Sequence, residues 1–293
     1  MIPDFVKLKE IKPVLCGFIR EAQFRLDPDE IPDENVVHDI RVLMKRSRAT
    51  IRLLKSQMDE ESFIREYSAL REVGRIMRSW RETSVHRKLV KYLKKKYPAL
   101  FSHLTDNEKI NLLLNKPDPE KAPSPEIKKD IENVMGLLHK SDYRWRFRSM
   151  NNLNPHLLLK ELEITFNSAS FSYLKARNYP TSVNVHEFRK ITKDFLYQLW
   201  YFRSLKPKVI KDLEKRLENL AQNLGKYNDH SVLIKTLDYK YPSSDNSNAT
   251  DELAVLIKEE QDRYLMKVWP AAFRIFRPGK NLGSVLGFKV PEV

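Results

Sequence analysis

The sequence predicts an all-α protein, and three observations support this fold class. Only seven of the 293 residues are glycine, the ordinary residue that disfavours helices most after proline. Apolar residues recur at helical spacing through most of the chain, between long charged stretches. A hydrophobic content of 41%, with fourteen Phe and four Trp, is enough for a packed core. We therefore expect one large helical domain spanning 1–293.

Twelve helical segments are expected along the chain. Their approximate ranges are 4–25, 35–57, 60–82, 84–96, 107–115, 125–139, 155–177, 183–204, 207–224, 226–238, 250–268 and a short piece at 270–277. The proline-rich segment 115–126 and the polar segment 241–252 are predicted to be loops, because proline and clustered Ser, Asn and Asp interrupt helices. "YRWRFR" at 143–148 alternates aromatic and basic residues, and we interpret it as an extended connector.

The helix expected at 35–57 carries an apolar stripe and a basic file on different sides. The stripe consists of Ile40, Met44, Ser47, Ile51 and Leu54, with Leu43 at its edge. The file consists of His38, Arg41, Lys45, Arg48 and Arg52, whose offsets place them on one helical face. Burying an unpaired guanidinium would cost several kcal/mol, about 3 to 5. This file must therefore face water, acids or an anionic ligand.

The next helix adds further cations on one face. Arg71, Arg75 and Arg78 share that face, and Arg81 lies one step aside. From residue 38 to 97 there are seventeen Lys or Arg and seven Asp or Glu, so this fifth of the chain carries most of the +14 net charge. Such a basic balance favours polyanionic partners such as nucleic acid or phosphate polymers.

A second histidine-led helix predicts an internal repeat. "VHDIRVLMKRSRATIRLL" from residue 37 aligns with "VHEFRKITKDFLYQLWYF" from residue 185 at an offset of 148. Phe188, Ile191, Phe195, Leu199 and Phe202 form the apolar stripe of the second copy. Its other side carries His186, Arg189, Lys193 and Tyr197, with Lys190 at the edge. We expect an N-terminal half (1–140) and a C-terminal half (150–293), packed about an approximate two-fold axis.

Composition also indicates the cellular compartment. Cys16 is the only cysteine, which excludes an internal disulfide and indicates a reducing compartment. No run of eighteen apolar residues occurs, and the N-terminal segment carries acids, unlike a signal peptide. We therefore expect a cytoplasmic protein without membrane association. The oligomeric state stays open.

These two histidine-led segments resemble the CHAD domain, the conserved histidine α-helical domain family associated with inorganic polyphosphate. "VHDIRVLMKRSR" and "VHEFRKITKDFLY" are similar to the two family motifs, and "LGKYNDHSVL" at 224–233 resembles a third segment. The resemblance implies two helical bundles around a basic groove or pore, and a location near polyphosphate granules. The second copy departs from the family at Asp194 and Leu196, where arginines are usual, and so is expected to bind less.

We expect non-enzymatic binding of a linear polyphosphate. Five cationic positions over fourteen residues extend about 21 Å along a helix, which suits a linear polyanion better than a single phosphate. The expected binding residues are His38, Arg41, Lys45, Arg46, Arg48, Arg52, Arg71, Arg75, Arg78, Arg81, His186, Arg189, Lys190, Lys193 and Lys226. Tyr197, Asn228 and Asp229 are expected to orient them. No catalytic residue, metal or cofactor is expected. His38 and His186 either contact phosphate or form a structural hydrogen bond.

Two alternatives use the same residues. An RNA- or DNA-binding protein could use the basic surface, with the aromatic residues of 143–148 stacking on bases. A metal-dependent phosphohydrolase could use the His38-Asp39 pair, although His86, His103, His139 and His156 lack the spacing of metal ligands. Competition between oligonucleotides and polyphosphate, and a metal-dependent phosphate-release assay, distinguish these functions.

Overall fold

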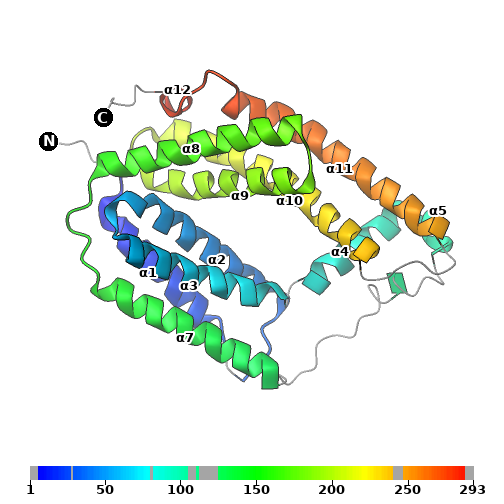
Figure 1. Cartoon of the computed structure of the whole chain (residues 1–293), viewed down its shortest axis with the longest axis horizontal. Helices are drawn as coiled ribbons and strands as arrows, with labels where there is room; N and C mark the ends of the chain where they lie inside the picture. The colour runs from blue at the N-terminus through cyan, green and yellow to red at the C-terminus, as the bar shows by residue number, and fades with distance from the viewer. Residues whose placement is uncertain are drawn as a thin grey trace.

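Every regular element that the structure describes is a helix, which confirms the all-α prediction (Figure 1). The computed structural model describes residues 6–27, 29–79, 82–104, 110–111, 125–239 and 247–287. The expected helix at 107–115 lies almost entirely outside these residues. So does most of the predicted loop at 115–126, although 125 and 126 begin a helix.

Four helices of the N-terminal part pack together. They are α1 (Leu8–Phe24), α2 (Glu34–Leu53), α3 (Glu60–Ser79) and α7 (Pro125–Phe147). The side chain of Asp33 accepts a hydrogen bond from the Val36 amide at 2.7 Å, so α2 begins four residues before His38. A short 3-10 turn, Lys55–Gln57, continues α2 to the predicted end.

Four further helices form a second group, which lies above the first in Figure 1. They are α8 (Pro155–Asn178), α9 (Ser182–Leu199), α10 (Pro207–Tyr239) and α11 (Ser247–Phe276). A 3-10 turn (Trp200–Phe202) follows α9, and the short α12 (Leu282–Leu286) contacts α8. Asn154 and Thr181 cap α8 and α9 through their side chains.

One hydrophobic core joins the two groups, and α2 and α9 contact each other within it. The predicted stripe of α2 is buried in full, and that of α9 is buried except for the half-buried Ile191. At their meeting point the Gln198 amide donates to the Ala49 carbonyl at 3.0 Å, and the hydroxyls of Thr50 and Tyr201 lie 2.9 Å apart. The two histidine-led helices therefore cross through their C-terminal halves.

A separate hydrophobic cluster lies where α4 (Glu82–Lys96) and α5 (Pro98–Ser102) meet α10 and α11. Val90, Leu93 and Phe101 pack there against Leu237 and Ile257. Beside this cluster the buried carboxylate of Glu260 accepts hydrogen bonds from Lys96 Nζ and the Tyr97 hydroxyl, both at 2.7 Å, and from Arg263. This network fixes the end of α4 to α11.

The interpretation of 143–148 as an extended connector is wrong, because α7 continues to Phe147. Trp145 is fully buried and extends the stripe of Val134, Leu138 and Ser141 at helical spacing. Burying an indole outweighs the locally strand-like alternation. The exposed side chains of Tyr143 and Phe147 pack against each other one turn apart, with ring centroids 4.9 Å apart.

Two predicted helix breaks are also wrong. The ranges 207–224 and 226–238 form the single helix α10, which passes through Gly225. The ranges 250–268 and 270–277 belong to the single helix α11, with Pro270 inside it. Val268 and Ala272 are both buried in the same core on either side of this proline, and their burial offsets its helix-breaking cost of about 3 kcal/mol. Of the loop predicted at 241–252, residues 247–252 are helical and the rest lies outside the described residues.

Candidate anion-binding site

The exposed side of α2 carries the predicted basic file at different depths. His38 and Arg46 are exposed, whereas Arg41, Lys45, Arg48 and Arg52 are half-buried. Nη1 of Arg41 donates a hydrogen bond to the Gly74 carbonyl of α3 at 2.7 Å. The file is therefore only partly exposed, and the guanidinium of Arg41 is held by α3.

Arg48, Arg52 and Arg71 form a crowded cationic cluster around Tyr67. The guanidinium carbons of Arg48 and Arg52 lie 6.0 and 4.9 Å from the Tyr67 ring centroid. Burial lowers the pKa of Arg48, and the charges of Arg52 and Arg71 lower it further, against the influence of Tyr67. In the described part of the chain neither Arg48 nor Arg71 forms an ion pair. An anion at this cluster would relieve the repulsion.

Arg52 already has an anionic partner from the second histidine-led helix. Its Nη1 is ion-paired with Asp194 of α9, and its Nη2 is bonded to the Tyr67 hydroxyl. Asp194 stands where the family usually has an arginine, so the departure noted in the sequence has a structural consequence. A carboxylate of the second half neutralises a cation of the first.

Tyr197 joins the cations of both helices. The Arg46 guanidinium of α2 lies 5.7 Å from the Tyr197 ring centroid, and Lys193 Nζ of α9 lies 5.6 Å from it. Arg46 also lies 5.9 Å from the Phe18 ring of α1. Burial raises the pKa of the Tyr197 hydroxyl, so this ring is neutral at physiological pH and can orient cations through its face.

The N-terminal part of α9 is held against α10. Nδ1 of His186 lies 2.6 Å from Oδ1 of Asn228, so the ring donates to the amide oxygen. Partial burial and the charges of Arg189 and Lys190 lower the pKa of His186, against the influence of Asn228. The Arg189 guanidinium lies against Gly225, where an added Cβ would stand 3.4 Å from Nε and Nη2. Asn228 thus contacts the second motif histidine, and its orienting role stays a prediction.

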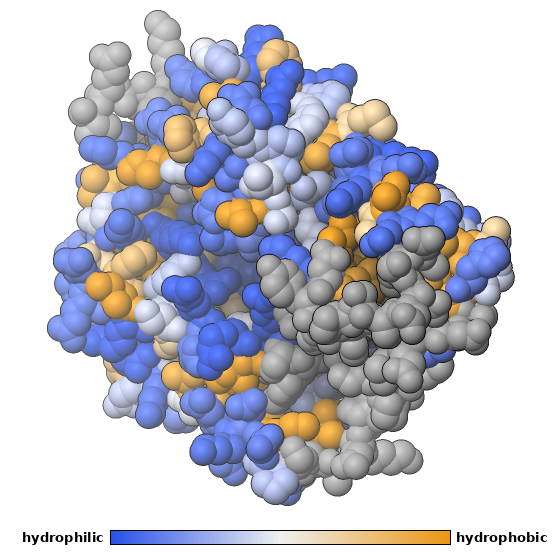
Figure 2. Space-filling model, turned by 45° about the vertical axis from the view of Figure 1, so that its right-hand side comes forward, coloured by the Kyte–Doolittle hydropathy of each residue, from blue (hydrophilic) through white to orange (hydrophobic). Residues whose placement is uncertain are grey.

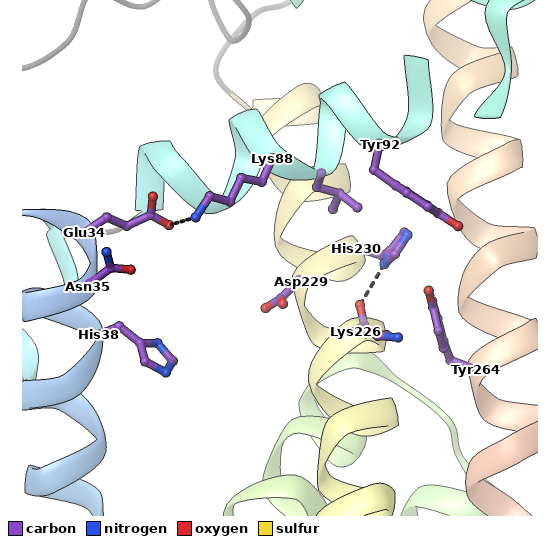
Figure 3. A pocket seen from close by; sticks show the side chains of 10 residues that line it. Glu34, Asn35, His38, Lys88, Tyr92, Lys226, Asp229, His230 and Tyr264 are labelled. Carbon is purple, nitrogen blue, oxygen red and sulfur yellow. Dashed lines mark hydrogen bonds and ion pairs between the residues drawn. The ribbon is translucent and has the colours of Figure 1, made fainter. Parts of the chain in front are cut away.

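His38 of α2 faces a pocket that the same segment of α10 also lines. Together with Lys226 and Asp229 it lines a pocket of about 540 Å³ between α2, α4, α10 and α11 (Figure 3). His186 contacts the segment 226–229 of α10 at Asn228, and His38 faces the same segment across this pocket. Figure 2 shows a depression surrounded by hydrophilic side chains on one face of the molecule.

The remaining predicted residues are placed differently. Arg71, Arg75 and Arg78 are exposed on α3, and Nε of Arg75 donates to its neighbour Glu72 at 2.8 Å. Lys190 forms an ion pair with Glu187 at 2.6 Å. Arg81 lies outside the described residues. Arg75 and Lys190 are thus each compensated by an acid on their own helix.

Sequence reasoning missed three contributors to this region. Tyr67 of α3 contacts two cations of α2, and Tyr92 of α4 and His230 of α10 line the pocket beside His38. Tyr67 could have been found, because it lies one turn before Arg71 on the face of α3 that carries the basic residues. Tyr92 and His230 come from helices whose packing no local pattern predicts.

A comparison with protein families identifies the family of this chain. The model of the CHAD domain matches residues 20–238, from the middle of α1 to the end of α10. The chain belongs to the CHAD domain family. CHAD domains are linked in general to polyphosphate binding and are generally non-catalytic. No curated protein sequence matches this chain significantly.

Two features are absent from the described residues. No group of three or more His, Cys, Asp or Glu side chains is arranged there as a metal site. None of the helices in these ranges is long and apolar enough to cross a membrane.

Proposed function

We propose that this CHAD protein binds inorganic polyphosphate, without hydrolysing it, along a basic surface shared by α2, α3, α9 and α10. The main support is the meeting of cations from both histidine-led helices, where Arg46 and Lys193 contact the same Tyr197 ring. A linear polyanion that bridges these helices would contact cations of both halves at once. The family membership supports the same ligand class.

The cationic cluster on α2 and α3 supplies the strongest part of this surface. Arg48 and Arg71 are crowded by like charge, so phosphate oxygens there would gain both hydrogen bonds and relief of repulsion. Arginine forks bind phosphate oxygens in pairs, which suits successive phosphates of a chain. His186 and Asn228 extend the surface along α10.

The nucleic-acid alternative receives less support from the stretch at 143–148. Its arginines are paired with acids: Arg144 with Glu66, Arg146 with Asp142 at 3.0 Å, and Arg148 with Asp59 at 3.8 Å. Base stacking on Tyr143 and Phe147 would therefore lack an unpaired arginine within this stretch. A competition assay decides between the two ligands. Polyphosphate should displace labelled polyphosphate better than an oligonucleotide of equal phosphate concentration.

Titration of the full chain with long-chain polyphosphate at physiological salt tests the proposal directly. We expect binding far tighter than that of sulfate, with an affinity that falls steeply as salt rises, because each bound phosphate releases counterions. Binding no tighter than that of sulfate would reject the proposal. Phosphate release on addition of Mg²⁺ or Mn²⁺ would reject its non-enzymatic part.

A further inference from the structure

The pocket beside His38 has a lining unlike the basic surface. Helix α2 contributes Glu34 and His38, α4 contributes Tyr92, α10 contributes Lys226 and Asp229, and α11 closes the far side (Figure 3). The α11 wall lies outside the residues that the family model matches. Its volume of about 540 Å³ falls in the range that holds small metabolites.

Charge in this pocket is mixed rather than positive. Glu34 is ion-paired with Lys88 at 2.8 Å, so that pair contributes little net charge. Lys226 and Asp229 line the same pocket with opposite charges. A segment of polyphosphate would meet the Asp229 carboxylate here and be repelled by it. The pocket therefore favours a ligand that carries one anionic group together with hydrogen-bond donors.

His230 supplies the second observation. Its ring is only 2% exposed and lines the pocket, and its Nδ1 donates a hydrogen bond to the Lys226 carbonyl at 2.7 Å. Burial lowers the pKa of His230, so the ring is neutral and its Nε2 is a hydrogen-bond acceptor. Within the described residues Nε2 has no hydrogen-bond partner, and it faces the side of the pocket where Tyr92 lies (Figure 3). A buried acceptor of this kind requires a donor.

We propose that this pocket binds a phosphorylated sugar, either free or as the sugar-phosphate part of a nucleotide. The phosphate would lie at Lys226 and His38, and sugar hydroxyls would donate to the Asp229 carboxylate and to His230 Nε2. Tyr92 and Tyr264 would cover the less polar face of the ligand. The interior of a polyphosphate chain has no hydroxyl donors, so this ligand is distinct from the one proposed for the basic surface. The two share only Lys226 and His38.

Calorimetric titration of the full chain with ribose 5-phosphate, AMP and inorganic phosphate tests the proposal. Ribose 5-phosphate should bind at least about tenfold more tightly than inorganic phosphate, since each hydroxyl bonded to a buried or charged acceptor adds roughly that factor. Equal affinity of AMP and ribose 5-phosphate would identify the sugar phosphate as the ligand. An AMP affinity about tenfold higher would identify a nucleotide. Equal affinity of ribose 5-phosphate and inorganic phosphate would overturn the proposal.

The Asp229→Ala variant tests the carboxylate that would bind the sugar hydroxyls, and Asp212→Ala is its matched control. Asp229→Ala should weaken ribose 5-phosphate binding by about tenfold, whereas Asp212→Ala should leave it unchanged. Asp212 is an exposed carboxylate on the same helix, about 25 Å away along the axis. If both variants bind alike, the proposal fails. His230 is not among the residues proposed for the basic surface, so a His230→Phe variant should keep its long-chain polyphosphate binding, which makes the outcome independent of the proposed polyphosphate function.

His230→Phe tests the buried acceptor. Phenylalanine keeps the ring contact with Tyr264, whose centroid lies 5.5 Å away, but removes both nitrogens. We expect about a tenfold weaker affinity for ribose 5-phosphate with an unchanged affinity for inorganic phosphate. Circular dichroism checks the fold of this variant. If it does not fold, Asp229→Ala alone decides.

Discussion

The two histidine-led helices begin alike and end differently. In each, a motif arginine lies against a glycine of the following helix: Arg41 bonds the Gly74 carbonyl, and Arg189 lies on Gly225. Further along, Arg46, Arg48 and Arg52 of α2 correspond at an offset of 148 to Asp194 and Leu196 of α9 and to Trp200 of the 3-10 turn after it. Leu196 is only 7% exposed, and Asp194 neutralises Arg52. The first half thus carries the charge, and the second half positions and partly offsets it.

The largest effect should come from the charged half. Arg41→Glu with Arg48→Glu places one carboxylate in the cationic cluster and another in the basic file before it. The double variant should weaken polyphosphate binding at least about 100-fold, through lost charge-assisted bonds and new repulsion. Circular dichroism should keep its helical form, and fluorescence or calorimetric titration measures the affinity. The control reverses the exposed Arg216 and Arg274, which lie on α10 and α11. A similar loss in the control would mean that only net charge matters.

The corresponding change in the second half should cost less. Arg189→Glu with Lys193→Glu removes the same number of cations, but fewer neighbouring cations surround them, so a loss of about tenfold is expected. The same titration measures it, with the Arg216 and Arg274 double variant again as control. A loss of affinity equal to that of the first pair would contradict our expectation that α9 contributes less to polyphosphate binding than α2.

Removing the internal counter-charge should strengthen binding. Asp194→Asn releases Arg52 for phosphate, and we expect a polyphosphate affinity about threefold to tenfold higher. The same change should lower the free energy of unfolding by about 1 kcal/mol or more, because the pair is partly buried. Asp212→Asn, which alters an exposed carboxylate on α10, is the matched control in titration and thermal unfolding. Unchanged or weaker polyphosphate binding by Asp194→Asn would show that Asp194 stabilises the structure and does not compete with phosphate for Arg52.

Proton uptake by His186 should make binding pH-dependent. Its pKa is lowered in the ligand-free protein, and a polyanion nearby would raise it, so the complex binds more protons than the free protein. Affinity should therefore rise as pH falls from 8 to 5.5, by up to about tenfold per unit of pKa change. His186→Gln should flatten this titration profile, whereas His139→Gln, an exposed histidine on α7, should not. An identical slope in both variants would exclude His186 as the source.

The smallest effects concern the two glycines. An Ala Cβ at position 74 would stand 3.8 Å from Arg48 Nη1, an ordinary contact, so Gly74→Ala should raise the free energy of unfolding by up to about 1 kcal/mol. At position 225 the Cβ would stand 3.4 Å from the Arg189 guanidinium, so Gly225→Ala should shift it and weaken polyphosphate binding about twofold. Thermal unfolding and titration of both variants check this. Equal binding by both would show that the Arg189 position is unimportant.

Hydrophobic periodicity predicted the features that depend on a single helix. The buried stripes of α2 and α9 follow from apolar spacing, and so does the outward position of the basic file. The contacts between helices could not be predicted in this way. Nothing in the local sequence indicates that Asp194 meets Arg52, or that His230 and Tyr92 line the pocket beside His38. Such contacts depend on how α2, α4, α9 and α10 cross.

The errors have a common physical origin, in that tertiary burial overrides local signals. Gly225 and Pro270 are helix-breaking residues by propensity, yet α10 and α11 continue through them because their flanking residues are buried in one core. The alternation at 143–148 concealed Trp145, whose buried position is visible only when the stripe is followed from Leu138. The approximate two-fold relation and the division at 140–150 stay predictions.

The network around Glu260 constrains how the chain can be made. A ribosome delivers α4 well before α11, and the bond between Lys96 and Glu260 spans 164 residues. Until α11 emerges, Val90, Leu93 and Phe101 of the early helices lack the apolar side chains of Leu253 and Ile257 that cover them in the finished fold. A nascent chain therefore exposes these apolar side chains until α11 is synthesised. A chain truncated before α11 would keep these apolar side chains exposed and would be prone to aggregate.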